Sequence, residues 1–146
     1  MTSRGSLRVA HVEDIPAMHV VRMAVRENPL SDPSRIQPRD YEEMIEKRGR
    51  GWVYEIDGRI VGFSVGDHSR RNIWALFIEP GFEGRGIGRV LHDAMVKWLF
   101  EQSPEPLWLT TTPSTRAESF YRAAGWRFAG EAPHGEIRFE MDPQQG

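Results

Sequence analysis

The sequence contains no cysteine, and this absence removes several kinds of site at once. Disulfides, zinc sites built from thiolates and a cysteine nucleophile are all excluded, and a reducing compartment is the simplest environment for such a chain. Apolar stretches are also far shorter than the roughly 20 residues that a membrane-spanning helix needs. The first eight residues lack the apolar core of a signal peptide. We therefore expect a cytoplasmic protein with no membrane partner.

A large excess of one charge is missing as well. The 19 basic and 21 acidic residues give a formal net charge of −2, so no global field recruits nucleic acid, and we expect no nucleic-acid partner. The five histidines show no metal-ligand spacing, and we expect no metal. With 146 residues, of which 39% are hydrophobic, the chain fits a single domain over residues 1–146 with one core.

The N-terminal third predicts an edge strand, two helices and a loop between the helices. The strand is expected over residues 7–10. Apolar residues then recur at helical spacing over residues 15–25, behind Asp14 as a plausible N-cap. Several prolines over residues 28–38 break any helix and predict the loop. A second, shorter helix is expected over residues 40–47.

The middle of the chain predicts strands. Residues 52–56 run into Asp57-Gly58, which is the strongest kind of short hairpin signal, and residues 59–65 return as the partner strand. The apolar run over residues 72–78 is typical of a strand that is buried on both faces.

The remaining elements are two helices and three strands. We expect a long helix with apolar residues from Ile87 to Leu99, a strand over 107–111, a helix over 115–124 that ends at Gly125, and strands over 126–129 and 137–141. The full order is strand, two helices, three strands, helix, strand, helix and two strands. This order indicates an α/β (α+β) domain, in which a mixed sheet carries helices on its faces.

Three glycines, at positions 84, 86 and 88, separate the apolar strand from the long helix. Glycine lets the backbone approach a phosphate without a Cβ in the way, and the first N–H groups of a helix point at such an anion. Arg85 and Arg89 add positive charge. Arg89 occupies the position of the third glycine in a dinucleotide-binding fingerprint, and the lysine of a P-loop is missing. A purely structural turn and a phosphate-bearing cofactor of another kind both remain open.

The segment from Asn72 to Leu91 resembles the acetyl-CoA signature of the GNAT acetyltransferases. That signature is a strand, a proline shortly after its last aliphatic residue, and a Gln/Arg-x-x-Gly-x-Gly/Ala turn that begins a helix. The resemblance implies a GNAT-like acyl-CoA N-acyltransferase fold with acetyl-CoA as cosubstrate. It also implies a cradle for the pyrophosphate of coenzyme A, made by the backbone of Gly84, Arg85, Gly86, Ile87, Gly88 and Arg89.

The same resemblance gives roles to the strand before this turn. The pantetheine arm of the cofactor would pair with the main chain at Phe77 and Ile78 as an added strand. The N–H of Ile78 would stabilise the oxyanion that forms during acetyl transfer. One residue departs from the signature, because its Gln/Arg position holds Glu83, an acid that could pair with a neighbouring arginine.

A second segment, residues 114–126, carries a second likeness to the family. Thr115 and Glu118 have the spacing of a helix-capping box. The family pattern here is Asn-x-x-Ala-x-x-Phe/Leu-Tyr-x-x-x-Gly-Phe, and the matching residues are Ser114, Ala117, Phe120, Tyr121, Gly125 and Trp126. Ser114 replaces the usual asparagine but keeps a hydroxyl that can hydrogen-bond the cofactor arm. The two signatures and the elements around them span about residues 51–128.

Tyr121 is the general acid that the resemblance implies, because the family uses this tyrosine to protonate the departing thiolate of coenzyme A. Without the resemblance, a core tyrosine whose hydroxyl finds a partner is the ordinary explanation. The implied reaction is direct attack of a neutral amine on the acetyl thioester within a ternary complex. The acceptor is a small molecule or peptide with a primary amine that the sequence does not identify.

The general base is left unassigned. Many relatives carry a glutamate at the start of the central strand, where this chain has Asn72, and asparagine cannot take a proton. Asp67, His68 and Glu136 are the alternatives, although each has an ordinary explanation as a solvated polar residue. Without a base, the domain could be a non-catalytic sensor that binds acyl-CoA.

The acceptor site of the family usually lies along the first two helices and their loop. On this chain that region offers Arg22, Glu27, Asn28 and Asp32. Acidic residues there could attract a cationic amine, but a solvated charged loop predicts the same residues. Dimers are common among relatives, so a homodimer is compatible with the resemblance.

Overall fold

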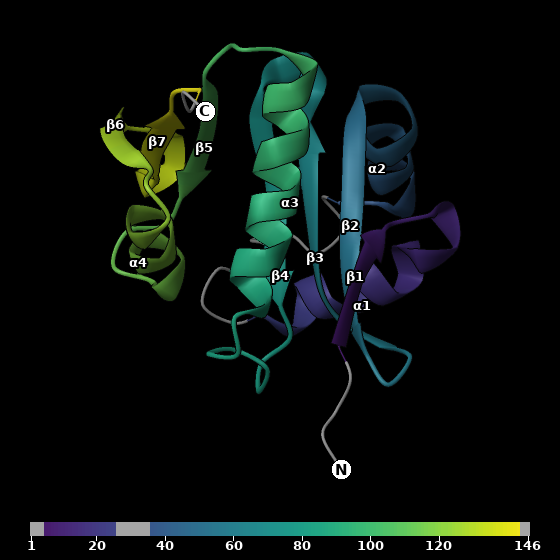
Figure 1. Cartoon of the computed structure of the whole chain (residues 1–146). Coiled ribbons are helices and arrows are strands. Elements are labelled where there is room, and N and C mark those ends of the chain that lie inside the picture. Colours follow the sequence, from purple (N-terminus) through teal and green to yellow (C-terminus); the bar gives the residue numbers. More distant parts are fainter. Residues whose placement is uncertain (1–4, 26–35, 144–146) are drawn as a thin grey trace.

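Seven strands form one mixed sheet in the computed structural model, which describes residues 5–25 and 36–143 (Figure 1). The order across the sheet is β1-β2-β3-β4-β5-β7-β6, and each neighbouring pair is antiparallel except β4 and β5. The strands are β1 (Gly5–Val9), β2 (Gly49–Ile56), β3 (Arg59–Asp67), β4 (Asn72–Ile78), β5 (Leu107–Thr111), β6 (Arg127–Glu131) and β7 (Ile137–Met141).

Helices connect these strands in the order that the sequence predicts. The α-helices are α1 (Ile15–Ala24), α2 (Pro38–Glu43), α3 (Ile87–Gln102) and α4 (Arg116–Ala123), and the short helical turns are η1 (Val12–Asp14), η3 (Met44–Arg48), η4 (His68–Arg70) and η5 (Pro133–Gly135). The expected mixed α/β sheet is confirmed. None of the helices within residues 5–25 and 36–143 combines the length and the apolar character that crossing a membrane would require.

The hairpin between β2 and β3 is made by the two residues that predict it. Asp57 and Gly58 have φ values of +52° and +81°, and a two-residue type I′ turn requires positive φ at both positions. Ile56 and Arg59 pair directly across this turn. The local sequence therefore sets the register next to the turn, and a bulge at Val61 shifts it by one residue from Tyr54 onward.

The first two helices differ in detail from the sequence expectation. α1 begins at Ile15, but the side chain of Asp14 makes no cap hydrogen bond. Its carboxylate instead accepts two hydrogen bonds of 2.8 Å from the guanidinium of Arg8, which ties β1 to the start of α1 and lowers the pKa of Asp14. The helix expected over residues 40–47 is α2 followed by a π-helical turn over Met44–Arg48.

Two apolar clusters lie on opposite faces of the sheet. α3 and α4 pack on one face, where Leu91, Met95 and Phe139 are fully buried. α1 and α2 pack on the other, where Met18 and Tyr41 are buried. Figure 1 shows α3 lying along one face of the strands, with α1 and α2 behind them. α3, which begins at the glycine turn of residues 84–88, and α4, which ends before Gly125, therefore share one face of the sheet.

The pairing of β4 with β5 is confined to one end of the two strands. Within the described residues, Asn72 and Trp108 are the one pair in register between them. The N–H of Trp108 donates to the carbonyl of Arg71 at 3.0 Å, and the amide Nδ2 of Asn72 donates to the carbonyl of Trp108 at 3.2 Å. Beyond this point the two strands diverge, so the sheet is split along its middle.

A bulge in β4 lies next to this split. Val65 and Gly66 of β3 stand opposite Ala75 and Ile73, which leaves Trp74 as an extra residue on β4. A bulge bends its strand and increases the local twist. The expectation that β4 is buried on both faces is wrong for most of the strand. Only two of its seven residues, Ile73 and Ala75, are buried, because the edge of β4 toward β5 is open.

Arg71 fastens the closed end of the split. Its guanidinium donates to the carbonyls of Leu99, at 2.9 Å, and of Ser103, at 2.8 Å. It also donates to the carbonyl of Glu105 at 2.7 Å. These carbonyls belong to the last turn of α3 and the loop that leads to β5, so one side chain caps the helix and fixes where β5 begins.

Replacement of Arg71 by methionine tests this fastening. The variant keeps most of the apolar stem but leaves three carbonyls without their charged donor, and we expect it to lose about 2–3 kcal/mol of the free energy of unfolding. The measurement is urea denaturation followed by circular dichroism. Arg70→Met is the matched control, because Arg70 is exposed and contributes to β5 only through its main-chain carbonyl. Equal losses in the two variants would contradict the role given to Arg71.

Candidate functional site

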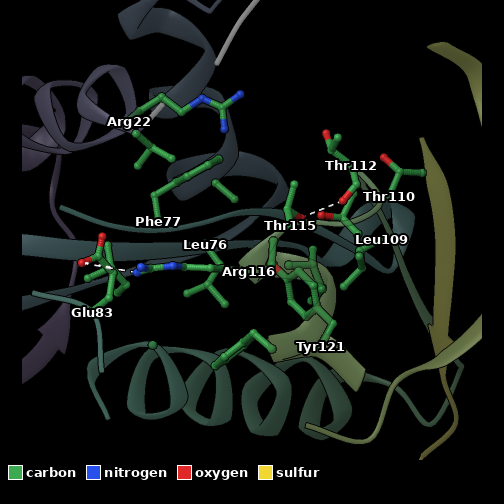
Figure 2. Close-up of a pocket in the computed structure, with 18 of the residues that line it drawn as sticks. Arg22, Leu76, Phe77, Glu83, Leu109, Thr110, Thr112, Thr115, Arg116 and Tyr121 are labelled. Carbon is green, nitrogen blue, oxygen red and sulfur yellow. Dashed lines mark hydrogen bonds and ion pairs between the residues drawn. The ribbon is translucent and has the colours of Figure 1, made fainter. Parts of the chain in front are cut away.

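The divergence of β4 and β5 opens a cavity of about 1130 Å³ (Figure 2). β4 and β5 form its two walls, and the glycine turn, the start of α3 and the N-terminal half of α4 line it on one face of the sheet. On the other side the lining includes Arg22 and Val25 at the end of α1, and His134 and Glu136 from the turn between β6 and β7. The cavity therefore brings together segments from both ends of the chain.

The open edge of β4 carries main-chain groups that no strand takes up. The N–H of Glu79 donates to the carbonyl of Val61 in β3 at 2.8 Å, and successive N–H groups along a strand point to opposite sides. The N–H of Ile78 therefore points to the open edge, and that of Phe77 points back toward β3. Ligand pairing with the main chain of Ile78 fits this geometry. The main chain of Leu76, two residues earlier, points to the same open edge. The expected pairing of a ligand with the main chain of Phe77 is therefore not supported by the strand geometry.

The glycine turn ends in a helix start with free donors. Gly84 and Gly86 have φ values of +77° and +82°, and open space surrounds the position of a Cβ on each. Their conformation is therefore the reason for glycine here. Gly86 is the N-cap of α3, and the first bond of the helix runs from the N–H of Val90 to the carbonyl of Gly86 at 3.1 Å. The N–H groups of the three preceding residues, from position 87 to 89, have no partner inside the helix.

The structure divides the six residues expected in the pyrophosphate cradle into two groups. Those that line the cavity are Gly84, Gly86, Gly88 and Arg89. Ile87 turns its side chain into the core, where it is 3% exposed, and Arg85 lies with its guanidinium carbon 5.0 Å from the centre of the Phe82 ring. Because the expected contacts use the backbone, the roles of Ile87 and Arg85 stay predictions.

The carboxylate of Glu83, at the mouth of the cavity, has two partners. It accepts a hydrogen bond of 2.9 Å from the N–H of Gly81 and lies 3.8 Å from the guanidinium of Arg116 (Figure 2). The bond from Gly81 is the main reason that the pKa of Glu83 is lowered. The neighbouring arginine anticipated from the sequence is thus Arg116 of α4, on the other side of the opening.

The start of α4 is capped by Thr115, as its sequence predicts. The N–H of Glu118 donates to the Thr115 hydroxyl at 3.3 Å. The carboxylate of Glu118 accepts from the N–H of Ser114 at 2.7 Å, one residue before the position that a standard capping box uses. Ser114 is exposed, has a φ of +63° and lies outside the lining of the main cavity, so its contact with a cofactor arm stays a prediction.

Tyr121 lies on the cavity side of α4, and only 7% of the residue is exposed (Figure 2). Its ring packs between Phe120 and Trp126, with centroid distances of 5.4 and 6.0 Å. Within the described part of the chain its hydroxyl has no hydrogen-bond partner. Burial raises the pKa of Tyr121 well above its ordinary value of 10. The phenol therefore remains protonated throughout the physiological range.

A buried histidine supports this aromatic group from α3. The indole N–H of Trp126 donates to Nε2 of His92 at 2.9 Å, and Nδ1 of His92 lies 2.8 Å from the carboxylate of Asp93. Because the indole can only donate, Nε2 must accept, and the ring proton is on Nδ1. Burial lowers the pKa of His92, although Asp93 acts in the opposite direction. Only 2% of His92 is exposed, although it lies beside the exposed Asp93.

The three alternative bases occupy very different places. Asp67 is 1% exposed, pairs with Arg48 at 2.8 Å and does not line the cavity. His68 packs its ring against Trp98, also outside the cavity. Glu136 alone of the three lines the cavity, where it is half-buried. Of these three groups, Glu136 is therefore the one that a ligand in the cavity can contact.

The expected acceptor residues are only partly described. Arg22 lines the cavity, while Glu27, Asn28 and Asp32 lie outside the described residues. Sequence reasoning missed Thr110 and Thr112, which line the β5 wall. A run of threonines at the end of a strand was the available signal. Among the described residues, no group of three or more histidine, aspartate and glutamate side chains could hold a metal ion.

Comparison with known proteins relates this cavity to one family. The model of the acetyltransferase (GNAT) family matches residues 17–126. This range includes both segments that resemble the family, residues 72–91 and 114–126. No curated protein matches the sequence.

Solved structures share the fold at low identity. A GNAT-family acetyltransferase from Staphylococcus aureus has a TM-score of 0.82 at 14% identity, with 97% of this chain and 100% of that chain covered. Ard1 from Thermoplasma volcanium has a TM-score of 0.80 at 20% identity, with 97% and 99% covered. PaiA N-acetyltransferase from Thermoplasma acidophilum, solved in complex with coenzyme A, has a TM-score of 0.76 at 12% identity, with 95% and 99% covered.

The buried His92 gives the stability of the protein a testable dependence on pH. A histidine whose pKa is lowered by folding binds its proton more readily in the unfolded chain, so its contribution is complete above the ordinary pKa of 6.5 and is lost as pH falls below it. His92→Gln keeps an acceptor for Trp126. As pH falls from 7.5 to 5, we expect its free energy of unfolding to decrease less than that of the natural protein. Urea denaturation across this range measures the difference. His134→Gln, at an exposed turn, should retain the natural slope, and a natural slope in His92→Gln would show that His92 is not the titrating group.

Proposed function

The chain belongs to the GNAT acetyltransferase family, and from that membership we propose that it transfers an acetyl group from acetyl-CoA to a primary amine. The acceptor attacks directly in a ternary complex. The observation that carries the proposal is the split between β4 and β5, which joins an unpaired strand edge to a helix start with free N–H groups in one cavity. The unpaired strand edge suits an extended arm that contains amides. The free N–H groups of the helix start suit a phosphate.

The residues at the helix start fit the diphosphate of coenzyme A. The N–H groups at positions 87 to 89 are free, and the positive φ of Gly84 and Gly86 shapes the turn that presents them. Arg89 adds a cation whose Nε is held 3.0 Å from Asp93. The acid at Glu83 is drawn toward Gly81 and Arg116, so its charge is partly offset.

Ile78 supplies the donor at the reacting centre. Bound acetyl-CoA provides an activated acetyl group whose thiolate is a good leaving group. The N–H of Ile78 faces the open edge and donates to the acetyl oxygen as negative charge develops there. This donor is fixed by the pairing of β4 with β3, so it needs no reorganisation during the reaction.

Tyr121 acts as the general acid. The amine nitrogen first bonds to the acetyl carbon; as the C–S bond then breaks, the hydroxyl gives its proton to the sulfur, and the proton that the nitrogen loses returns to the phenolate through water. The raised pKa of Tyr121 keeps this proton in place before the reaction. The same apolar surroundings also disfavour a free thiolate, so burial raises the proton affinity of both donor and acceptor.

Glu136 acts as the general base, directly or through a water. It is the one of the three alternative acids and bases that lines the cavity, and its carboxylate makes no ion pair with another described residue. A lysine-like amine is mostly protonated at neutral pH and must lose a proton before attack. Asn72, at the position where many relatives have a glutamate, is engaged with Trp108 and holds the two strands together instead.

The decisive experiment measures release of free coenzyme A from acetyl-CoA with a panel of amines, beside calorimetric binding of coenzyme A. Binding together with amine-dependent release supports acetyl transfer. Binding without release from any amine would favour the non-catalytic sensor, and absence of binding would remove both functions.

Gly86→Ala tests the helix start as a phosphate site. Alanine is strained at a φ of +82°, which changes the direction of the free N–H groups, and we expect the Kd for coenzyme A to rise at least about tenfold. Gly58→Ala is the control, because Gly58 has a φ of +81°, equally open surroundings and a place in the distant hairpin. Both variants should lose about 1–2 kcal/mol of stability, but calorimetry should find weaker binding only for Gly86→Ala. Unchanged binding in both would remove the cradle.

Tyr121→Phe tests the general acid. We expect kcat to fall about 100-fold or more, with the Kd for coenzyme A unchanged because the ring is retained. In the natural enzyme the raised pKa of Tyr121 predicts no loss of rate from its ionisation between pH 8 and 10. Steady-state kinetics with a thiol reagent give both results. Tyr54→Phe, on β2 outside the cavity, serves as the control, and full turnover in Tyr121→Phe would end this assignment.

A further inference from the structure

Arg22 is a cation inside the cavity that has no counter-ion among the residues that the structure describes. It projects from α1, lines the cavity and is half-buried. Its guanidinium carbon lies 4.0 Å from the centre of the Phe77 ring. Among residues 5–25 and 36–143 it makes neither a hydrogen bond nor an ion pair. Figure 2 shows its side chain beside Phe77, with the guanidinium extending toward the part of the cavity where Thr112 lies.

An unpaired guanidinium in such a place is unusual. Arginines that lose hydration are normally paired with an acid, because a partly buried charge is costly without a partner. Burial is the main reason that the pKa of Arg22 is lowered, and its one aromatic contact, with Phe77, supplies no hydrogen-bond acceptor for the guanidinium. The planar fork of five N–H donors that arginine carries is suited to a carboxylate or a phosphate.

Glu136 places an opposite charge in the same cavity. Tyr41 and then Glu136 oppose the lowering of the Arg22 pKa by burial, but Glu136 and Arg22 do not form an ion pair. Arg22 comes from α1 and Glu136 from the turn before β7, so the two unpaired charges face the cavity from separate elements. A cation and an anion held apart in this way match a ligand that carries both charges.

The position of Arg22 relates this pair to the reacting centre. Phe77, on which the guanidinium stacks, directly precedes Ile78, whose N–H faces the open edge. The two residues project to opposite faces of β4, so Arg22 lies on the face covered by α1 and α2. The glycine turn and α3 are on the other face. The anion site is therefore on the acceptor side of the cavity and separate from the phosphate site.

We propose that the acceptor is a small amine with a carboxylate or phosphate a few bonds from its nitrogen, the anion bound by Arg22 and the amine by Glu136. This inference rests on the proposed acetyl transfer. It narrows the acceptor from any primary amine to amino acids and similar zwitterions. It also excludes polyamines, which would place further positive charge beside Arg22.

Matched acceptor pairs test the proposal with the full chain and acetyl-CoA. Each amino acid is compared with its carboxamide, and phosphoethanolamine with ethanolamine, so that only the anion changes within a pair. Replacing a carboxylate by an amide lowers the pKa of the neighbouring amine, so intrinsic reactivity favours the amide. We expect the charged member to have the lower KM by about 10- to 100-fold, as a charge-assisted hydrogen bond predicts. The two pair types also separate a carboxylate from a phosphate as the preferred anion.

Variants separate the roles of the two charges. Arg22→Met should raise KM for the anionic acceptor about 10- to 100-fold and leave that for the carboxamide unchanged. Glu136→Gln should raise KM for both members of a pair, because both carry the amine. Arg50→Met is the control, since Arg50 is an exposed arginine whose guanidinium carbon lies 5.1 Å from the centre of the Trp98 ring, outside the cavity. It should change neither KM.

Direct binding keeps the test independent of turnover. Calorimetry of the same acceptor pairs is carried out with and without coenzyme A. It should detect binding of the anionic member to the natural protein and no binding of it to Arg22→Met. Equal binding of both members, or binding that is unaffected by Arg22→Met, would overturn the proposal while leaving acetyl transfer intact. Coenzyme A that fails to bind would instead count against the proposed function, and the acceptor titration without coenzyme A would still decide the anion site.

Discussion

The loss of main-chain pairing between β4 and β5 is the constraint from which the rest of the site follows. Within the described residues the two strands meet in register only at Asn72 and Trp108, and a bulge at Trp74 lies just beyond that point. Strand edges are normally paired because unpaired N–H and C=O groups are costly when they are buried. Here the edge of β4 opens into a cavity, so a ligand can supply the missing partners.

The structure holds this split open from its closed end. Arg71 binds the last turn of α3 and the loop before β5, while Asn72 bonds across to Trp108. These contacts fix where the strands separate, and α3 then carries its free N–H groups to the mouth of the opening. On the same face, His92 and Trp126 connect α3 to the end of α4, the helix that carries Tyr121. One helix thus positions both the proposed phosphate site and the proposed general acid.

Burial determines the character of the charged and polar groups around the cavity. Burial raises the pKa of Tyr121 and lowers the pKa values of His92 and Arg22, although the three groups lie in different surroundings. Each shift favours the neutral form, as desolvation requires. Arg22 nevertheless stays charged, because arginine titrates far above neutral pH. The cavity therefore holds a protonated phenol and a cation with no counter-ion among the described residues, and the neutral imidazole of His92 lies outside it, against Trp126.

The sequence by itself determined the elements whose causes are local. Asp57 and Gly58 set a hairpin through their positive φ, Thr115 caps α4, and Gly86 marks the start of α3. These features depend on residues that are neighbours in the chain, so a pattern can predict them. The order of strands and helices and the identity of the family followed from the same kind of pattern.

Only the tertiary structure decided which distant groups meet. It gave Glu83 a partner in α4, buried His92 against Trp126 and brought Glu136, but neither Asp67 nor His68, to the cavity. It also brought Arg22 into the cavity with no counter-ion from residues 5–25 or 36–143. Burial and pairing depend on where the sheet splits and which strands lie side by side, and a single sequence encodes these long-range contacts only through the whole fold.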